Sequence, residues 1–141
     1  SGTEVATTGA FQTTHGGLFD GFVAKFNASG VRQWGTFFGE SGDEVISSIA
    51  LSATGDVYCV GKELSTIATS STLLATPASH QLTHSGGIND AILVKFNASG
   101  ARQWSSYFGG LADDEATACA VDNSANIYLV GSSSSTSRRS S

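Results

Sequence analysis

The sequence reads Asp20-Gly-Phe-Val-Ala-Lys-Phe-Asn-Ala-Ser-Gly-Val-Arg-Gln-Trp-Gly-Thr-Phe-Phe-Gly39, and 70 residues further on it reads Asp90-Ala-Ile-Leu-Val-Lys-Phe-Asn-Ala-Ser-Gly-Ala-Arg-Gln-Trp-Ser-Ser-Tyr-Phe-Gly109. Twelve of these twenty positions are identical. The offset continues without a gap, so that Val60-Gly61 corresponds to Val130-Gly131. Because a fixed period is the signature of repeat architectures, we predict two copies of one structural unit.

Each copy contains four short segments that are rich in aromatic and β-branched residues and are bounded by turn formers, as strands are. They are Phe22–Phe26, Arg32–Phe38, Ile46–Leu51 and Asp56–Gly61 in the first copy, and Ile92–Phe96, Arg102–Phe108, Ala116–Val121 and Asn126–Gly131 in the second. Asn-Ala-Ser-Gly turns end at Gly30 and Gly100, where glycine suits the left-handed position of a type I hairpin with a bulge. We therefore predict an all-β fold of about eight short antiparallel strands.

Several of these segments are apolar on both faces. Phe22-Val23-Ala24 and Ile92-Leu93-Val94 are uninterrupted apolar runs, whereas a strand that is covered on one face alternates apolar and polar residues. The blades of a β-propeller are sheets that stack face to face around an axis, so both faces of each blade are covered. The pattern favours β-propeller blades.

The order of the conserved blocks resembles the SBBP-type β-propeller repeat, which is known chiefly from secreted or cell-surface bacterial proteins. The blocks include Lys95-Phe-Asn-Ala-Ser-Gly100, Trp104 and Asn126-Ile-Tyr-Leu-Val-Gly131, and the resemblance extends from Gln12 to Gly131. It implies that a blade starts at the Ile46 segment, so that the chain holds a half blade, a whole blade and a half blade. It also implies an extracellular or cell-surface location and no shared catalytic residues.

We interpret residues 1–141 as a single repeat domain. Repeat 1 spans residues 12–61, a Ser/Thr-rich connector spans 62–80, repeat 2 spans 81–131, and a flexible tail spans 132–141.

Two half blades leave strand edges open, and open edges are templates for pairing with another chain. The edge residues are Phe22, Val23 and Ala24 in the first half blade and Ile127, Tyr128 and Leu129 in the last. We predict that the first strand pair of one molecule completes the last pair of the next, which gives a homo-oligomeric ring or a filament. One alternative is that the neighbouring blades belong to a longer polypeptide. Another is a glycan- or protein-binding propeller fragment of a larger secreted protein.

Composition argues against two classes of partner. The net charge is −5, and the seven Lys and Arg residues form no stripe, so we expect no binding to nucleic acid. No apolar run approaches the length of a membrane span, so we expect no membrane-spanning segment.

Asn27-Ala-Ser and Asn97-Ala-Ser match the N-glycosylation pattern and fall on predicted hairpin turns. Asn, Ser and Gly are also the residues that a tight turn prefers. The turn requirement explains both asparagines, and in a chain from a eukaryotic secretory source Asn27 and Asn97 are candidate glycosylation sites.

Polar clusters give no catalytic or metal-binding pattern. Asp43-Glu44 and Asp113-Asp-Glu115 are acidic, but their spacing matches no dense calcium motif, and we interpret them as turn caps and solvated charge. His15, His80 and His84 lie in connector segments without a fixed third ligand. We therefore expect no enzyme activity, no cofactor and no metal.

Two residue pairs occupy strand positions. Cys59 and Cys119 replace apolar residues of the other copy, which indicates buried small hydrophobic side chains rather than a disulfide. Trp34 and Trp104 recur at the same place in each copy. We interpret them as packing between sheets, and a carbohydrate platform is the alternative.

Overall fold

The computed structural model describes residues 4–65 and 73–136. Within these residues the chain forms β1 (Gly21–Phe26), β2 (Arg32–Phe38), β3 (Asp43–Leu51), β4 (Val57–Leu64), β5 (Asn89–Phe96), β6 (Arg102–Phe108), β7 (Asp114–Val121) and β8 (Ile127–Ser133). All the pairings between these strands are antiparallel. The prediction of an all-β fold with eight short antiparallel strands is confirmed.

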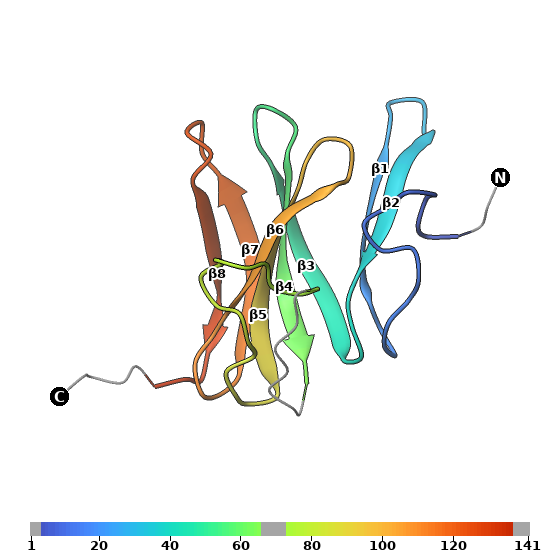
Figure 1. The fold of residues 1–141 in the computed structure, drawn as a ribbon. Helices are drawn as coiled ribbons and strands as arrows, with labels where there is room; N and C mark the ends of the chain where they lie inside the picture. The colour runs from blue at the N-terminus through green and yellow to red at the C-terminus, as the bar shows by residue number, and fades with distance from the viewer. Residues whose placement is uncertain (1–3, 66–72, 137–141) are drawn as a thin grey trace.

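The strands form three separate sheets that stand side by side (Figure 1). The order is β1-β2 in the first sheet, β3-β4-β5-β6 in the second and β7-β8 in the third. This is the predicted half blade, whole blade and half blade. The four-stranded sheet lies between the two strand pairs, so it is the one sheet of the described chain with a neighbour on each face (Figure 1).

The pairing register of the first strand pair recurs 70 residues later. Gly21 pairs with Phe38, and Ala91 pairs with Phe108. A bulge follows Lys25 in one hairpin and Lys95 in the other. The turns end in left-handed glycines, with φ 75° at Gly30 and 86° at Gly100, as the turn sequence predicts.

A second bulge lies in the inner strand of each copy. In β3 it falls between Ile46 and Ser48, opposite Gly61 of β4. The backbones approach so closely there that a Cβ on Gly61 would lie 1.8 Å from the carbonyl oxygen of Val45. Gly131 of β8 has the same environment, since its Cβ would lie 1.8 Å from the carbonyl oxygen of Glu115. Glycine is therefore required at both positions.

Apolar side chains fill the spaces between the sheets. The larger core joins β1 and β2 to the four-stranded sheet and contains Trp34, Phe38 and Phe96. The indole of Trp34 lies 6.3 Å from the ring of Phe96, and its Nε1 donates a hydrogen bond of 3.0 Å to the carbonyl oxygen of Ala98. Trp34 thus packs between sheets, as interpreted from the sequence. A smaller core, formed by Val60, Ala91 and Ala116, joins the four-stranded sheet to β7 and β8.

The segments that precede each β-hairpin run along the outer edge of its sheet. Thr7 N donates to Gly35 O at 2.9 Å, and Thr76 N donates to Ser105 O at 2.9 Å. Leu74 is buried in the larger core. The outer edges of β2 and β6 are therefore covered by the chain itself.

Several strands extend beyond the sequence boundaries, and β4 and β8 also cross the predicted limits of the repeats. β4 continues to Leu64, and β8 continues to Ser133, so the first residues of the predicted connector and of the predicted tail belong to strands. The reason is continued pairing, since Leu64 is paired with Asp43 and Asn89, and Ser133 is paired with Asp114. Residues 137–141 of the predicted tail lie outside the described residues.

Candidate interaction surface

The open edges of the two strand pairs are the candidate functional site. Among the described residues, β1 pairs with β2 alone and β8 pairs with β7 alone. The predicted edge residues Phe22, Val23 and Ala24 lie in β1, and Ile127, Tyr128 and Leu129 lie in β8. Each of these two strands therefore presents one row of unpaired backbone groups.

The side chains of β1 are exposed where their counterparts in β5 are buried. Phe22 is 59% exposed and Phe26 is 58% exposed, whereas Ile92 and Phe96 are 1% and 0% exposed. The two strands share one register within their hairpins. The difference arises because β5 has the β1–β2 pair packed against this face, while no described sheet covers the same face of β1.

The opposite end of the molecule shows the complementary difference. Phe108 of β6 is 50% exposed, but its counterpart Phe38 is 0% exposed. Val130 of β8 is 60% exposed, but its counterpart Val60 is 0% exposed. Large exposed apolar areas indicate interaction surfaces. The apolar side chains exposed at the two ends of the chain are thus the counterparts of side chains that are buried between its sheets.

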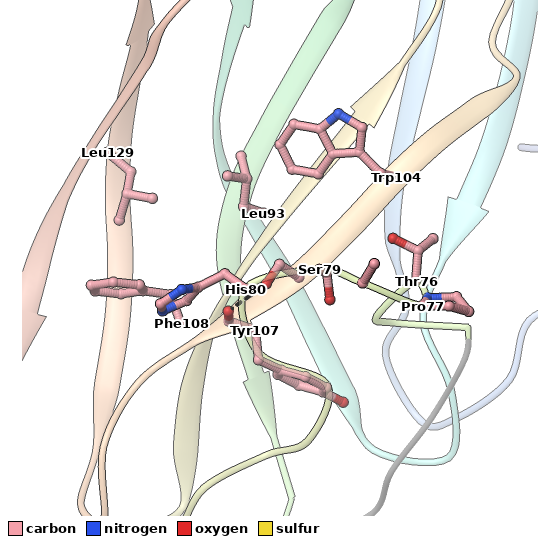
Figure 2. Close-up of a pocket in the computed structure, with 11 residues that line it drawn as sticks. Thr76, Pro77, Ser79, His80, Leu93, Trp104, Tyr107, Phe108 and Leu129 are labelled. Atoms are coloured by element: carbon pink, nitrogen blue, oxygen red, sulfur yellow. Dashed lines mark hydrogen bonds between the residues drawn. The ribbon is translucent and has the colours of Figure 1, made fainter.

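A groove of about 540 Å³ lies at this second end, between β6, β8 and connector residues 76–80 (Figure 2). Its apolar wall comes from Leu93, Trp104, Phe108 and Leu129. Figure 2 shows Leu129 on β8 across from Trp104 on β6, with Leu93 between them. The imidazole of His80 lies beside the ring of Phe108, with 5.7 Å between ring centroids.

The first junction is the contact between the β1–β2 pair and the four-stranded sheet. The positions there that are equivalent to the groove residues are part of the larger core. They are Val23, Trp34, Phe38 and Cys59, with Phe11 packed against them. Phe11 corresponds to His80, because Gln12-Thr-Thr-His15 aligns with Gln81-Leu-Thr-His84. The groove therefore lies at the second junction, between the four-stranded sheet and the β7–β8 pair. It lacks the strand that lies beside β4 in the first junction, where β5 contributes Ile92, Val94 and Phe96.

The strands that line this groove carry a recognisable repeat. Residues 103–137 match the SBBP beta-propeller repeat. The match confirms the resemblance seen in the sequence, and within the described residues it covers most of β6 and all of β7 and β8. No match was found among curated proteins. The SBBP repeat thus contains Trp104, Phe108 and Leu129, three of the residues that line the groove.

One aspartate in each copy, Asp20 or Asp90, anchors the loops around its hairpin. Gln12 Nε2 donates to Asp20 Oδ2 at 2.8 Å, and Gly39 N donates to Gln12 Oε1 at 3.0 Å. Gln81 joins Asp90 and the amide of Gly109 in the same way, at 3.0 and 2.9 Å. Asp43 and Asp113 also cap loops, since their Oδ1 atoms accept hydrogen bonds from the amides of Phe19 and Ile88. The interpretation of these acidic clusters as solvated charge is wrong for Glu44 and Asp114, because both are buried.

A group of buried acids lies at one end of the four-stranded sheet, and sequence reasoning missed it. Glu44, Glu63 and Asp90 are buried, and each has a carboxyl oxygen without a hydrogen-bond partner. His84 Nε2 lies 3.5 Å from Glu63 Oε2. Burial raises the pKa of Glu44 to about 8 and that of Glu63 to about 7, and neighbouring carboxylates add to both shifts. In the described residues no group of three or more His, Cys, Asp or Glu can hold a metal ion.

The two predicted glycosylation residues cap their turns. Asn27 Oδ1 accepts hydrogen bonds from the amides of Ser29 and Val31, at 3.0 and 2.9 Å. Asn97 Oδ1 accepts the equivalent bonds in the second copy. Both turns therefore use the asparagine side chain as a cap. They use its oxygen, whereas a glycan would modify its nitrogen. Glycosylation stays a prediction.

Both cysteines are free thiols. Cys59 is buried in the larger core, as predicted, and burial raises the pKa of its thiol to about 12. Cys119 is partly buried and packs against the smaller core.

Residues 4–65 and 73–136 contain no helix with the length and apolar character that a membrane span requires.

Proposed function

We propose that this chain is a non-enzymatic, extracellular structural or interaction protein, and that it assembles head to tail through its open strand edges. The observation that carries the proposal is the exposure of Phe22 and Phe26 at one end and of Phe108 and Val130 at the other, when every counterpart is buried. Burial of apolar surface and pairing of open edges both favour association.

The β4–β5 pairing supplies a template for the joint. Tyr58 pairs with Lys95, whose ammonium lies 5.3 Å from the centre of the tyrosine ring. At the offset of 70 residues, β8 of one molecule would pair with β1 of the next. The opposed residues would be Ile127 with Phe26, Tyr128 with Lys25, and Leu129 with Ala24. Cross-strand pairs of this kind stabilise sheets and fix their register.

The mass of the assembly in solution tests this function. We expect light scattering after size exclusion to give a multiple of the 14.4 kDa chain, with smaller species at low concentration. Electron microscopy distinguishes a closed ring from an open filament, because a head-to-tail contact closes only if its rotation allows. A chain that stays near 14.4 kDa over a wide range of concentrations would contradict self-assembly.

Glycosylation in a secretory host tests whether the two acceptor asparagines are accessible for modification. When a eukaryotic secretory host makes the chain, we expect deglycosylation to lower its mass because both acceptor sites lie on hairpin turns. Asn27→Asp and Asn97→Asp are the matched variants, since aspartate keeps the capping oxygen and removes the modified nitrogen. Each variant should lose one glycan. An untreated secreted chain with the bare mass of 14.4 kDa would contradict the prediction.

A second candidate function is binding of a glycan or another protein. The aromatic and apolar lining of the groove, with Trp104 and Phe108, favours it, because aromatic side chains combine a large apolar surface with a polar edge. Glycan-array binding by a monomeric chain would support this function, whereas assembly without added ligand would support the first.

A further inference from the structure

We infer that the groove between β6, β8 and residues 76–80 is the seat of the β1–β2 hairpin from a second copy of this chain. The inference rests on the proposed head-to-tail assembly. It goes further by naming the sheet face that the second copy covers, the side chains that enter the groove and the hydrogen bond that they complete.

The first junction shows how a tryptophan at this position is used. Trp34 Nε1 donates to the carbonyl oxygen of Ala98 at 3.0 Å, across the space between two sheets. Trp104 is its counterpart and forms part of the groove wall. Among the described residues no acceptor receives a hydrogen bond from its Nε1. The offset of 70 assigns that role to the carbonyl oxygen of Ala28 in the second copy.

The apolar contacts follow the same template. In the first junction Phe96 meets the rings of Phe11, Trp34 and Phe38, at centroid distances of 6.2, 6.3 and 6.3 Å. The counterpart of Phe96 is Phe26, which is exposed. In the assembled state its ring would meet His80, Trp104 and Phe108, which all line the groove. The exposed ring of Phe26 and the apolar lining of the groove would thus bury each other from water.

Of the substitutions between the two junctions, the exchange of Phe11 for His80 alters a cation–π contact. Phe11 of the first junction lies under the guanidinium of Arg102, 4.4 Å from the ring centroid. Its counterpart is His80, so Arg32 of the second copy would lie over an imidazole instead. Imidazole offers less apolar surface to the guanidinium than a phenyl ring does. We expect His80→Phe to tighten the assembly by about tenfold, because it recreates the buried junction.

The test uses two variants that each damage one side of the contact. Phe26→Lys alters the hairpin, and Phe108→Lys alters the groove; both side chains are exposed in the single chain, so neither variant removes an internal core contact. Each variant alone is expected to be monomeric. Their mixture is expected to form a 1:1 dimer that grows no further, because one intact hairpin enters one intact groove. Leu111→Lys is the control, since Leu111 is 66% exposed and lies outside the groove.

Formation of the mixed dimer shows in the same experiment that both variants fold. If the two variants assemble like the unaltered chain, the groove inference fails while the proposed self-assembly stands. If the unaltered chain is monomeric, both fail. If the mixture stays monomeric while Phe26→Ser and Phe108→Ser, as milder replacements, also leave no mixed dimer, the inference fails.

Discussion

Raising the pH from 4.5 to 8 is expected to lower the free energy of unfolding. The pKa of Glu44 rises from its ordinary value of 4.5 to about 8 in the folded chain, first because the carboxyl is buried. In this window the unfolded chain has lost a proton that the folded chain keeps, so the unfolded state is favoured as the pH rises. The loss is on the order of 4 kcal/mol. It is complete above pH 8, and Glu63 contributes in the same direction up to about pH 7.

Glu44→Gln isolates this effect, because glutamine is a neutral side chain of the same shape. Urea unfolding at fixed chain concentration should give equal stabilities for the variant and the unaltered chain near pH 4.5, and a more stable variant at pH 8. Asp114→Asn is the matched control at the counterpart position. Burial of Asp114 opposes ionisation, but hydrogen bonds from Ser133, Gly110 and Ser135 outweigh it and lower its pKa. The control should therefore lose stability at neutral pH, and a Glu44→Gln variant that did the same would contradict the prediction.

Gly61→Ala is expected to cost at least about 3 kcal/mol of stability. The added Cβ would lie 1.8 Å from the carbonyl oxygen of Val45 and 2.8 Å from its carbonyl carbon, and both are backbone atoms of the bulged strand. Relief requires the β3–β4 pairing to separate at the centre of the whole blade. Thermal or urea unfolding measures the loss.

Gly30→Ala provides the comparison for this substitution. A Cβ there meets nothing within 4 Å, and the cost is confined to the left-handed backbone at φ 75°. That cost is about 1 kcal/mol. Equal losses at Gly61 and Gly30 would show that the bulge yields easily and that the close approach does not hold the strands in place.

The sequence predicts the middle of each strand better than its ends. Apolar runs such as Ile92-Leu93-Val94 and the Asn-Ala-Ser-Gly turns are local signals, and each predicts its own element. The ends at Asp43, Asn89 and Ser133 are polar, and polar residues at strand ends resemble the turns that follow. Their pairing depends on the neighbouring strand, which the local pattern does not contain.

Because local patterns carry no information about neighbouring elements, the sequence predicts some parts of the candidate interaction surface and not others. The edge residues follow from the repeat phasing, because a blade boundary at Ile46 leaves two strand pairs without neighbours. The burial of Glu44 and Glu63 could not be predicted, since glutamate is ordinarily exposed and only the packing of several loops encloses these two. The groove had a signal in the sequence: Phe11 aligns with His80, which marks one junction as different from the other.

The partition of the strands into two, four and two has a consequence for symmetry. In the proposed head-to-tail assembly each copy of this chain would contribute the equivalent of two blades, so a closed ring would contain an even number of blades. Propellers usually have about four to eight blades, which leaves rings of two, three or four molecules and excludes those with five or seven blades. Around such a ring, junctions containing Phe11 alternate with junctions containing His80. The rotational symmetry of the proposed ring would therefore have an order equal to the number of chains, which is half the number of blades.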